Sequence, residues 1–115
     1  IYESLETHLG IKNHETTADG KVSIERIECN AACDYAPVVM VNWEFYDNQT
    51  PQSVKDLVDS ARAGNPTPPT RGPKTLRTWK QNSEVLAGLN DGLANEGVSA
   101  GEATLLGLKI AKGGK

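Results

Sequence analysis

Residues 27–37 of this chain read Ile-Glu-Cys-Asn-Ala-Ala-Cys-Asp-Tyr-Ala-Pro and contain both of its cysteines, Cys29 and Cys33. Two cysteines separated by three residues are compatible with three kinds of site: a pair of metal or cluster ligands, a small redox disulfide, or two buried structural thiols. The spacing alone leaves all three interpretations open, and the neighbouring residues are needed to decide which one is favoured.

The surroundings of the two cysteines favour a metal or an inorganic cluster. The residues between them are small, so the backbone can fold closely around a cluster and direct N–H groups at its sulfur atoms. A thioredoxin-type redox pair instead has the spacing C-x-x-C at the start of a helix, whereas a strand is predicted to follow here. We therefore predict Cys29 and Cys33 as ligands, within a cluster loop that also contains Asn30, Ala31, Ala32, Ala36 and Pro37.

The segments on both sides of this loop predict short strands. Upstream, Lys21–Cys29 follows the turn dipeptide Asp19-Gly20 and alternates as a strand does, with a change of phase that a β-bulge would absorb. Downstream, residues 38–41 are a continuous apolar run, typical of a strand buried on both faces. Residues 42–44 are the expected turn, and Phe45-Tyr46 begins a short return strand.

Two helices complete the predicted fold. Residues 1–9 carry one apolar stripe and end at Gly10, a typical C-cap glycine, with no capping residue before Ile1; we therefore expect that sequence upstream of Ile1 is missing. Thr50-Pro51 supplies an N-cap hydroxyl and a proline at the first helical position, and Gly64 ends that helix. The order helix, strand, strand, strand, helix predicts an α/β (α+β) fold with helices packed on a small mixed sheet.

The second half of the chain has a different composition. Residues 65–73 contain four of the six prolines and predict an extended linker. A weak helical stretch follows near residues 83–89, and Ser99-x-x-Glu102 is a capping box ahead of a Leu-rich helix at residues 103–111. We predict a domain over residues 1–64 and, over residues 65–115, a Pro-rich linker with an extended tail that binds a partner.

The overall composition excludes several classes of function. With 115 residues, 37% hydrophobic content and a net charge of −3, the chain has no broad positive field for nucleic acid and no apolar run long enough to insert into a membrane. His8 and His14 have no paired spacing and are interpreted as solvated side chains. Trp43 and Trp79 are interpreted as partner contacts. No acid pair, nucleophilic triad or phosphate-binding loop is found, so we predict no catalytic residue.

Several blocks of the sequence, taken together, form a recognisable pattern. They are, in order, Glu15-Thr16-Thr17, Asp19-Gly20, Ile27-Glu28-Cys29, Ala32 to Pro37, Val38 to Asn42, Phe45-Tyr46 and Thr50-Pro51. These blocks resemble the thioredoxin-like [2Fe–2S] subunit, known as the E subunit, of bacterial NADH–quinone oxidoreductase (respiratory complex I), over about residues 1–63. The family usually has glycine where Ala31 stands and aspartate where Trp43 stands, and the part from Arg62 onward looks like a lineage-specific, actinobacterial extension.

The resemblance implies a thioredoxin-like [2Fe–2S] ferredoxin domain, incomplete at its N-terminus, in which Cys29 and Cys33 are two of four cluster ligands and the other pair lies upstream of Ile1. It implies electron transfer without substrate chemistry in this subunit. NADH would be oxidised at a flavin mononucleotide on the adjoining F subunit, with the iron–sulfur G subunit also in the NADH-oxidising arm, on the cytoplasmic side of the bacterial cell membrane.

Two alternatives to this function stay open at this point. One is the equivalent diaphorase subunit of an NAD-linked hydrogenase or formate dehydrogenase, or a free thioredoxin-like ferredoxin. The other is a structural interaction module whose Cys29 and Cys33 form a disulfide or bind zinc.

Overall fold

The computed structural model describes residues 1–89, 97 and 100–114. Its contacts divide the chain into two compact units that alternate along the sequence. Unit 1 contains Ile1–Val39 and Tyr46–Thr67, and unit 2 contains Met40–Phe45 and Pro68–Lys115.

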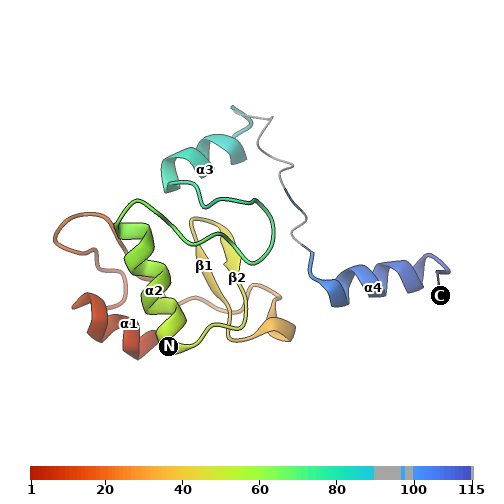
Figure 1. Cartoon of the computed structure of the whole chain (residues 1–115), viewed down its shortest axis with the longest axis horizontal. Coiled ribbons are helices and arrows are strands. Elements are labelled where there is room, and N and C mark those ends of the chain that lie inside the picture. Colours follow the sequence, from red (N-terminus) through yellow and green to blue (C-terminus); the bar gives the residue numbers. More distant parts are fainter. Residues whose placement is uncertain (90–96, 98–99, 115) are drawn as a thin grey trace. The chain divides into compact units, whose positions relative to one another are not determined.

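Unit 1 is built around two helices that pack on each other, α1 (Tyr2–Leu9) and α2 (Pro51–Arg62) (Figure 1). Both were predicted, because their ends are marked by local signals. The Gly10 residue after α1 is left-handed, with φ 68°, and the Thr50 side chain accepts a hydrogen bond from the Ser53 N–H at the start of α2. His8 and Asp59 join the two helices through a 2.8 Å contact between Nε2 and Oδ1.

The core of unit 1 lies where α1, α2 and the segment between them meet. Val54 on α2 is fully buried and Leu57 is 2% exposed, because their i, i+3 spacing places both on one face of the helix. Tyr46 is 2% exposed and its hydroxyl donates to the Thr67 carbonyl at 2.6 Å, so this large ring is buried with its polar end paired. The buried cluster is Leu5, Ile11, Ile24 and Val54.

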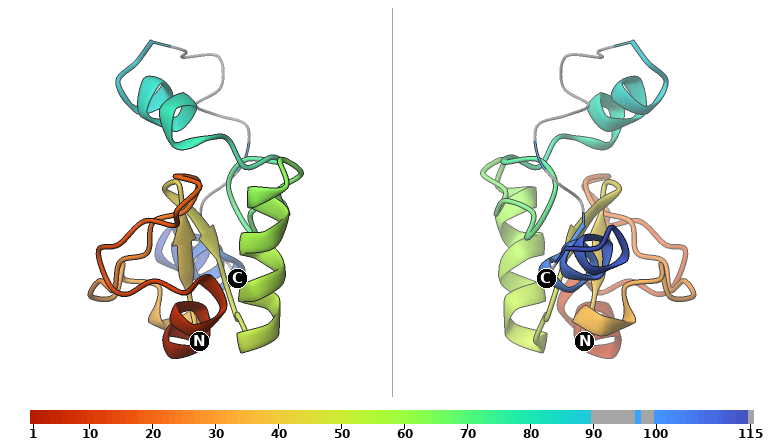
Figure 2. Two further views of the ribbon diagram at one scale, coloured as in Figure 1. Left: turned by 90° about the vertical axis from the view of Figure 1, so that its left-hand side faces the viewer. Right: turned by 90° about the vertical axis from the view of Figure 1, so that its right-hand side faces the viewer.

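Within the described residues the sheet is one hairpin, with strands β1 (Val39–Val41) and β2 (Glu44–Tyr46) (Figures 1 and 2). The predicted strand, turn and return strand are confirmed. The run at 38–41 is half-buried, however, so the expectation that it is covered on both faces is wrong. Asn42 and Trp43 both have positive φ, 49° and 70°, as a two-residue type I′ turn requires.

The predicted strand at Lys21–Cys29 is wrong. Antiparallel pairing is confined to one bridge, Thr16 with Ser23, on either side of the Asp19-Gly20 turn. The segment continues past Ile24 without joining a ladder of the described residues; the Arg26 N–H donates instead to the Asn13 side chain. The pairing stops near the predicted change of phase, and a strand without a ladder partner has no regular hydrogen bonding.

Unit 2 contains the hairpin residues 40–45 together with α3 (Trp79–Leu86) and α4 (Glu102–Ala111). The linker residues 65–73 contain no helix or strand, as predicted. Helix α3 begins four residues before the predicted stretch. Helix α4 begins after Gly101 as its N-cap, so the expected capping box does not start it, and Ser99 lies outside the described residues.

No helix within residues 1–89, 97 and 100–114 is long and apolar enough to cross a bilayer.

Candidate metal centre

Cys29 and Cys33 lie on an irregular loop and form no disulfide; both are exposed. Cys29 ends the extended segment that follows Ile24, and Cys33 opens η1, a single 3₁₀ turn over Cys33–Tyr35. The two sulfur atoms share a hydrogen bond, so the loop brings them together without joining them covalently. The interpretation as buried structural thiols is therefore wrong.

Ala31 shapes the loop between the two thiols. Its φ is 57°, in the left-handed region that an alanine rarely occupies, and its backbone N–H donates a hydrogen bond to the Cys29 sulfur. The loop thus keeps a left-handed residue at the position where the resemblance led us to expect glycine. The conformation directs one N–H group at the Cys29 sulfur.

These hydrogen bonds move the two pKa values in opposite directions. The Ala31 N–H, and then the Cys33 thiol, stabilise the Cys29 thiolate and lower the pKa of Cys29. The hydrogen bond to the Cys29 sulfur, the charge of that thiolate, burial and the Asp34 carboxylate raise the pKa of Cys33. As the pH rises, Cys29 is therefore deprotonated before Cys33. A cation between the two sulfur atoms would favour deprotonation of Cys33 as well.

The far side of the loop is fixed by backbone hydrogen bonds from residues after β2. The Asn48 N–H donates to the Tyr35 carbonyl at 2.9 Å and the Gln49 N–H donates to the Pro37 carbonyl at 2.8 Å. Ala32, next to Cys33, is 5% exposed and anchors the loop in unit 1. Asn48 and Gln49 were not predicted as site residues, although the polar turn Asp47-Asn48 before Thr50-Pro51 was a readable signal.

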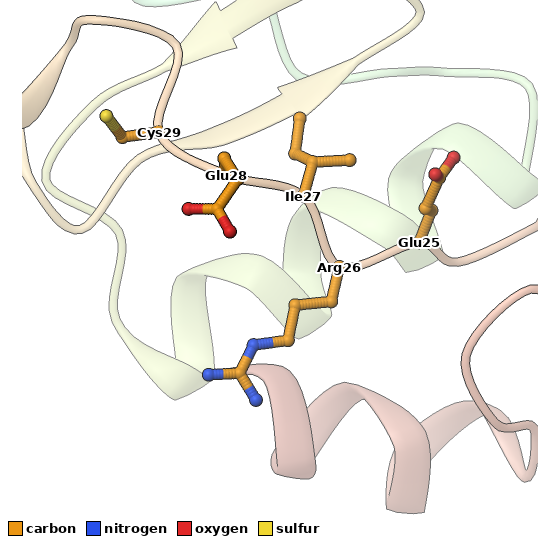
Figure 3. Close-up of a pocket in the computed structure, with 5 residues that line it drawn as sticks. All are labelled: Glu25, Arg26, Ile27, Glu28 and Cys29. Atoms are coloured by element: carbon orange, nitrogen blue, oxygen red, sulfur yellow. The ribbon is translucent and has the colours of Figure 1, made fainter.

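An open pocket of about 560 Å³ lies along the segment that leads to Cys29, lined by residues 25–29 (Figure 3). Arg26 extends from this segment toward α1, and its guanidinium carbon lies 5.7 Å from the centre of the Tyr2 ring. Ile27, with 54% of its surface exposed, and Glu28 leave the wall beside Cys29 partly apolar and partly acidic.

The donor set fits half of a [2Fe–2S] site. Thiolates are the usual ligands of iron in such clusters, and a cluster needs four ligands, of which this loop supplies two. Among the residues that the structure describes, no three His, Cys, Asp or Glu side chains lie together where they could hold a metal ion. His8 contacts Asp59, and His14 Nδ1 is 4.0 Å from a Glu25 carboxylate oxygen, so neither histidine joins the cysteines.

Comparison with known proteins gives relatives for nearly the whole chain. The E subunit of NADH-quinone oxidoreductase from Mycobacterium tuberculosis is 55% identical over 113 residues, which is 97% of this chain and 44% of that protein. The mitochondrial NADH dehydrogenase [ubiquinone] flavoprotein 2 of Dictyostelium discoideum is 38% identical over 77 residues, 67% of this chain and 30% of that protein. The E subunit of the Rickettsia bellii NADH-quinone oxidoreductase is 40% identical over 62 residues, which is 54% of this chain and 37% of that protein.

The chain therefore spans less than half the length of the mycobacterial relatives, and they match it well beyond residue 62. The sequence profile of thioredoxin-like [2Fe–2S] ferredoxins matches residues 1–62, which contain both cysteines, the hairpin and α2. This match covers more than half of the chain and confirms the predicted fold class: the chain belongs to the thioredoxin-like [2Fe–2S] ferredoxin family.

Proposed function

We propose that this chain is the electron-carrying part of the E subunit of an NADH–quinone oxidoreductase and that Cys29 and Cys33 ligate one side of its [2Fe–2S] cluster. The observation that carries the proposal is the pair of exposed, hydrogen-bonded thiols on one loop of a thioredoxin-like [2Fe–2S] domain. The names of the mycobacterial relatives support the choice of complex. The remaining two ligands would come from residues outside these 115, because the chain has only two cysteines.

When bound, the cluster would take up and release one electron. The residues of this chain hold it and tune it. The Ala31 N–H donates to the Cys29 sulfur, and a hydrogen bond to a ligating sulfur withdraws electron density and favours the reduced state. Asn48 and Gln49 hold the far side of the loop through their bonds to Tyr35 and Pro37. No side chain of this site is proposed as an acid, a base or a nucleophile.

The proposed partners are the flavin-bearing F subunit, which would oxidise NADH and deliver the electron, and the iron–sulfur G subunit. The proposed location is the peripheral arm of the complex on the cytoplasmic side of the bacterial membrane. Residues 65–115 are proposed as a linker and a partner-binding tail. Exposed apolar side chains on α4 support this role for its last part: Leu105, Leu106, Leu108 and Ile110 are 43–59% exposed.

Cys29→Ser and Cys33→Ser in the assembled complex test the ligand assignment. Each variant should lose the electron paramagnetic resonance signal of this [2Fe–2S] cluster after reduction, because an alkoxide oxygen is a poor substitute for thiolate on iron. Asn30→Ser, in the same loop, is the matched control and should keep the signal. A full signal in either cysteine variant would refute the assignment.

Metal analysis of the unmodified protein separates this proposal from the structural alternatives. Iron and acid-labile sulfide in equal amounts, with visible charge-transfer absorption, are the expected result. Zinc without visible absorption, or a Cys29–Cys33 disulfide in the isolated protein, would contradict it.

A further inference from the structure

The tip of the hairpin in unit 2 has an unfavourable backbone conformation. Trp43 has φ 70°, in the left-handed region where bulky residues without special stabilisation are rare, and Asn42 before it has φ 49°. A type I′ turn normally places asparagine and glycine at these two positions. A tryptophan at the second position therefore requires contacts that stabilise it.

Those contacts come from α3, more than thirty residues further along the chain. The Trp79 ring stacks on the Trp43 ring, with 3.6 Å between the centroids and 22° between the planes. Asn82, which is 3% exposed, donates to the Asn42 carbonyl and, at 3.1 Å, to the Glu44 carboxylate. A stacked ring pair and a buried, fully used amide are the kinds of contact that fix a strained turn.

The segment before α3 contacts both the turn and strand β2 after it. The Thr70 N–H and hydroxyl both donate to the Phe45 carbonyl, at 3.0 and 3.1 Å, and the Arg71 guanidinium lies 4.1 Å from the centre of the Phe45 ring. The Asn42 side-chain amide donates to the Arg77 carbonyl at 2.9 Å. We name residues 70–82 the clasp.

The start of α3 sets the two central contacts of the clasp. Thr78 accepts from the Gln81 N–H, and the Gln81 side chain accepts from the Thr78 N–H, which makes a complete capping box. The box fixes where the helix begins, so Trp79 occupies its first position and Asn82 its fourth. These two residues lie three apart and therefore on one side of the helix, the side that meets the turn.

We propose that the clasp is a positioning device for the cluster loop, with Trp79 and Asn82 as its positioning residues. Strand β1 begins two residues after Pro37, and the residues that follow β2, Asn48 and Gln49, hold the loop by their backbone N–H groups. A hairpin fixed at its tip restrains β1, which directly follows the cluster loop, and β2, which leads to Asn48 and Gln49. The proposal rests on the proposed function in one respect, that Cys33 holds a cluster.

The clasp lies beyond the family profile. That profile ends at residue 62, before the clasp begins, whereas the mycobacterial relatives match 97% of this chain. Restraint of the hairpin by residues 70–82 therefore uses residues that the family profile does not include.

Trp79→Ala in the complete subunit tests the restraint. Amide hydrogen exchange at residues 41–46 should become about tenfold faster, because the stacking partner of Trp43 is gone. Trp79→Phe should restore most of the protection, and Lys80→Ala, on the exposed side of α3, should leave it unchanged. Unchanged exchange at the hairpin in Trp79→Ala would refute the clasp, and this readout needs no cluster.

The positioning role has its own readout in the assembled complex. With the ligands intact, Trp79→Ala should keep the electron paramagnetic resonance signal but broaden its lines, since a loosened loop populates several geometries around the sulfur of Cys33. Trp79→Phe should return the narrow lines. Faster exchange with an unchanged signal would overturn the positioning role, whereas absence of the signal from the unmodified protein would overturn the proposed function instead.

Discussion

Ala31 holds a left-handed conformation, φ 57°, and so contributes strain at the centre of the cluster loop. A non-glycine residue in this region is less stable than in a helix or strand by roughly 1–2 kcal/mol. The compensation lies in its backbone N–H, which reaches the Cys29 sulfur. The same conformation that strains the loop directs a hydrogen-bond donor at the Cys29 sulfur.

Asp19 makes the stability of unit 1 depend on pH. Its carboxylate accepts hydrogen bonds from the Thr17 hydroxyl, from the Arg62 guanidinium at 2.7 Å and from the Lys21 N–H at 3.1 Å, and these hold its pKa well below the ordinary range. A lowered pKa in the folded state stabilises the fold above the unfolded-state pKa of about 3.9. That stabilisation is lost as the pH falls toward the lowered value.

We therefore expect Asp19→Asn to lower the urea midpoint at pH 7 and to have a smaller effect at pH 3, where the unfolded-state carboxyl is largely protonated. The control is Asp56→Asn, because Asp56 accepts one hydrogen bond from Gln52 on the same helix. Urea unfolding of both variants and of the unmodified protein at the two pH values gives the comparison. If Asp19→Asn lowered the urea midpoint equally at pH 7 and at pH 3, the lost stability would not come from the lowered pKa of Asp19.

At this scale the sequence indicates candidate site residues more readily than the backbone geometry around them. Cys29 and Cys33 were selected from their spacing and their small neighbours, both of which are local. The N–H groups of Ala31, Asn48 and Gln49 act through backbone geometry, which their side-chain types do not encode. Trp43 and Trp79, interpreted as partner contacts, stack on each other, and this pairing joins positions too far apart for any local pattern to indicate.

Among the elements, those with local signals were predictable. Helix α2 is specified by Thr50-Pro51 at its start and by its apolar spacing, and the structure reproduces it. The start of α3 has an equally local signal, Thr78 with Gln81, that our sequence interpretation missed. The prediction of a strand at residues 21–29 was wrong for another reason. A strand forms only when a second segment pairs with it, and the local sequence does not show whether such a segment is present.

Val54 is the residue on which the core of unit 1 depends most, since it is fully buried where α1 and α2 pack together. Val54→Ala should destabilise the fold by about 2 kcal/mol, from lost transfer free energy and an unfilled cavity. Val58→Ala removes the same atoms from a partly buried position on the same helix and should cost less. Denaturant unfolding measures both. Equal losses would show that the two sites are packed alike, contrary to the structure.

At the scale of the whole molecule, α4 stands out because it exposes its large apolar side chains. At 100° of rotation per residue, its four exposed apolar side chains point to different sides of the helix, so one flat surface cannot cover them all. They are Leu105, Leu106, Leu108 and Ile110. Each buried side chain of this size contributes about 1.5–3 kcal/mol. A helix that is apolar on several sides is typical of one enclosed by a partner.

Hydrogen exchange on the isolated protein and on the assembled complex tests this role of α4. We expect the amides of residues 102–111 to exchange freely in the isolated protein and to become protected in the complex. Those of α3 should be protected in both states, because the clasp holds this helix to its own hairpin. Protection of α4 already present in the isolated protein would mean that it folds onto its own chain, and the proposed partner contact would be refuted.

The alternation of the two units along the sequence limits how modular this protein can be. The chain passes from unit 1 to unit 2 after Val39, returns at Tyr46, and leaves again after Thr67, so no single cut separates the units. A transplant of the family domain alone would carry a hairpin whose Asn42 and Phe45 carbonyls have lost the donors that they use here. Transfer of this domain into another protein therefore has to include the hairpin turn together with residues 70–82.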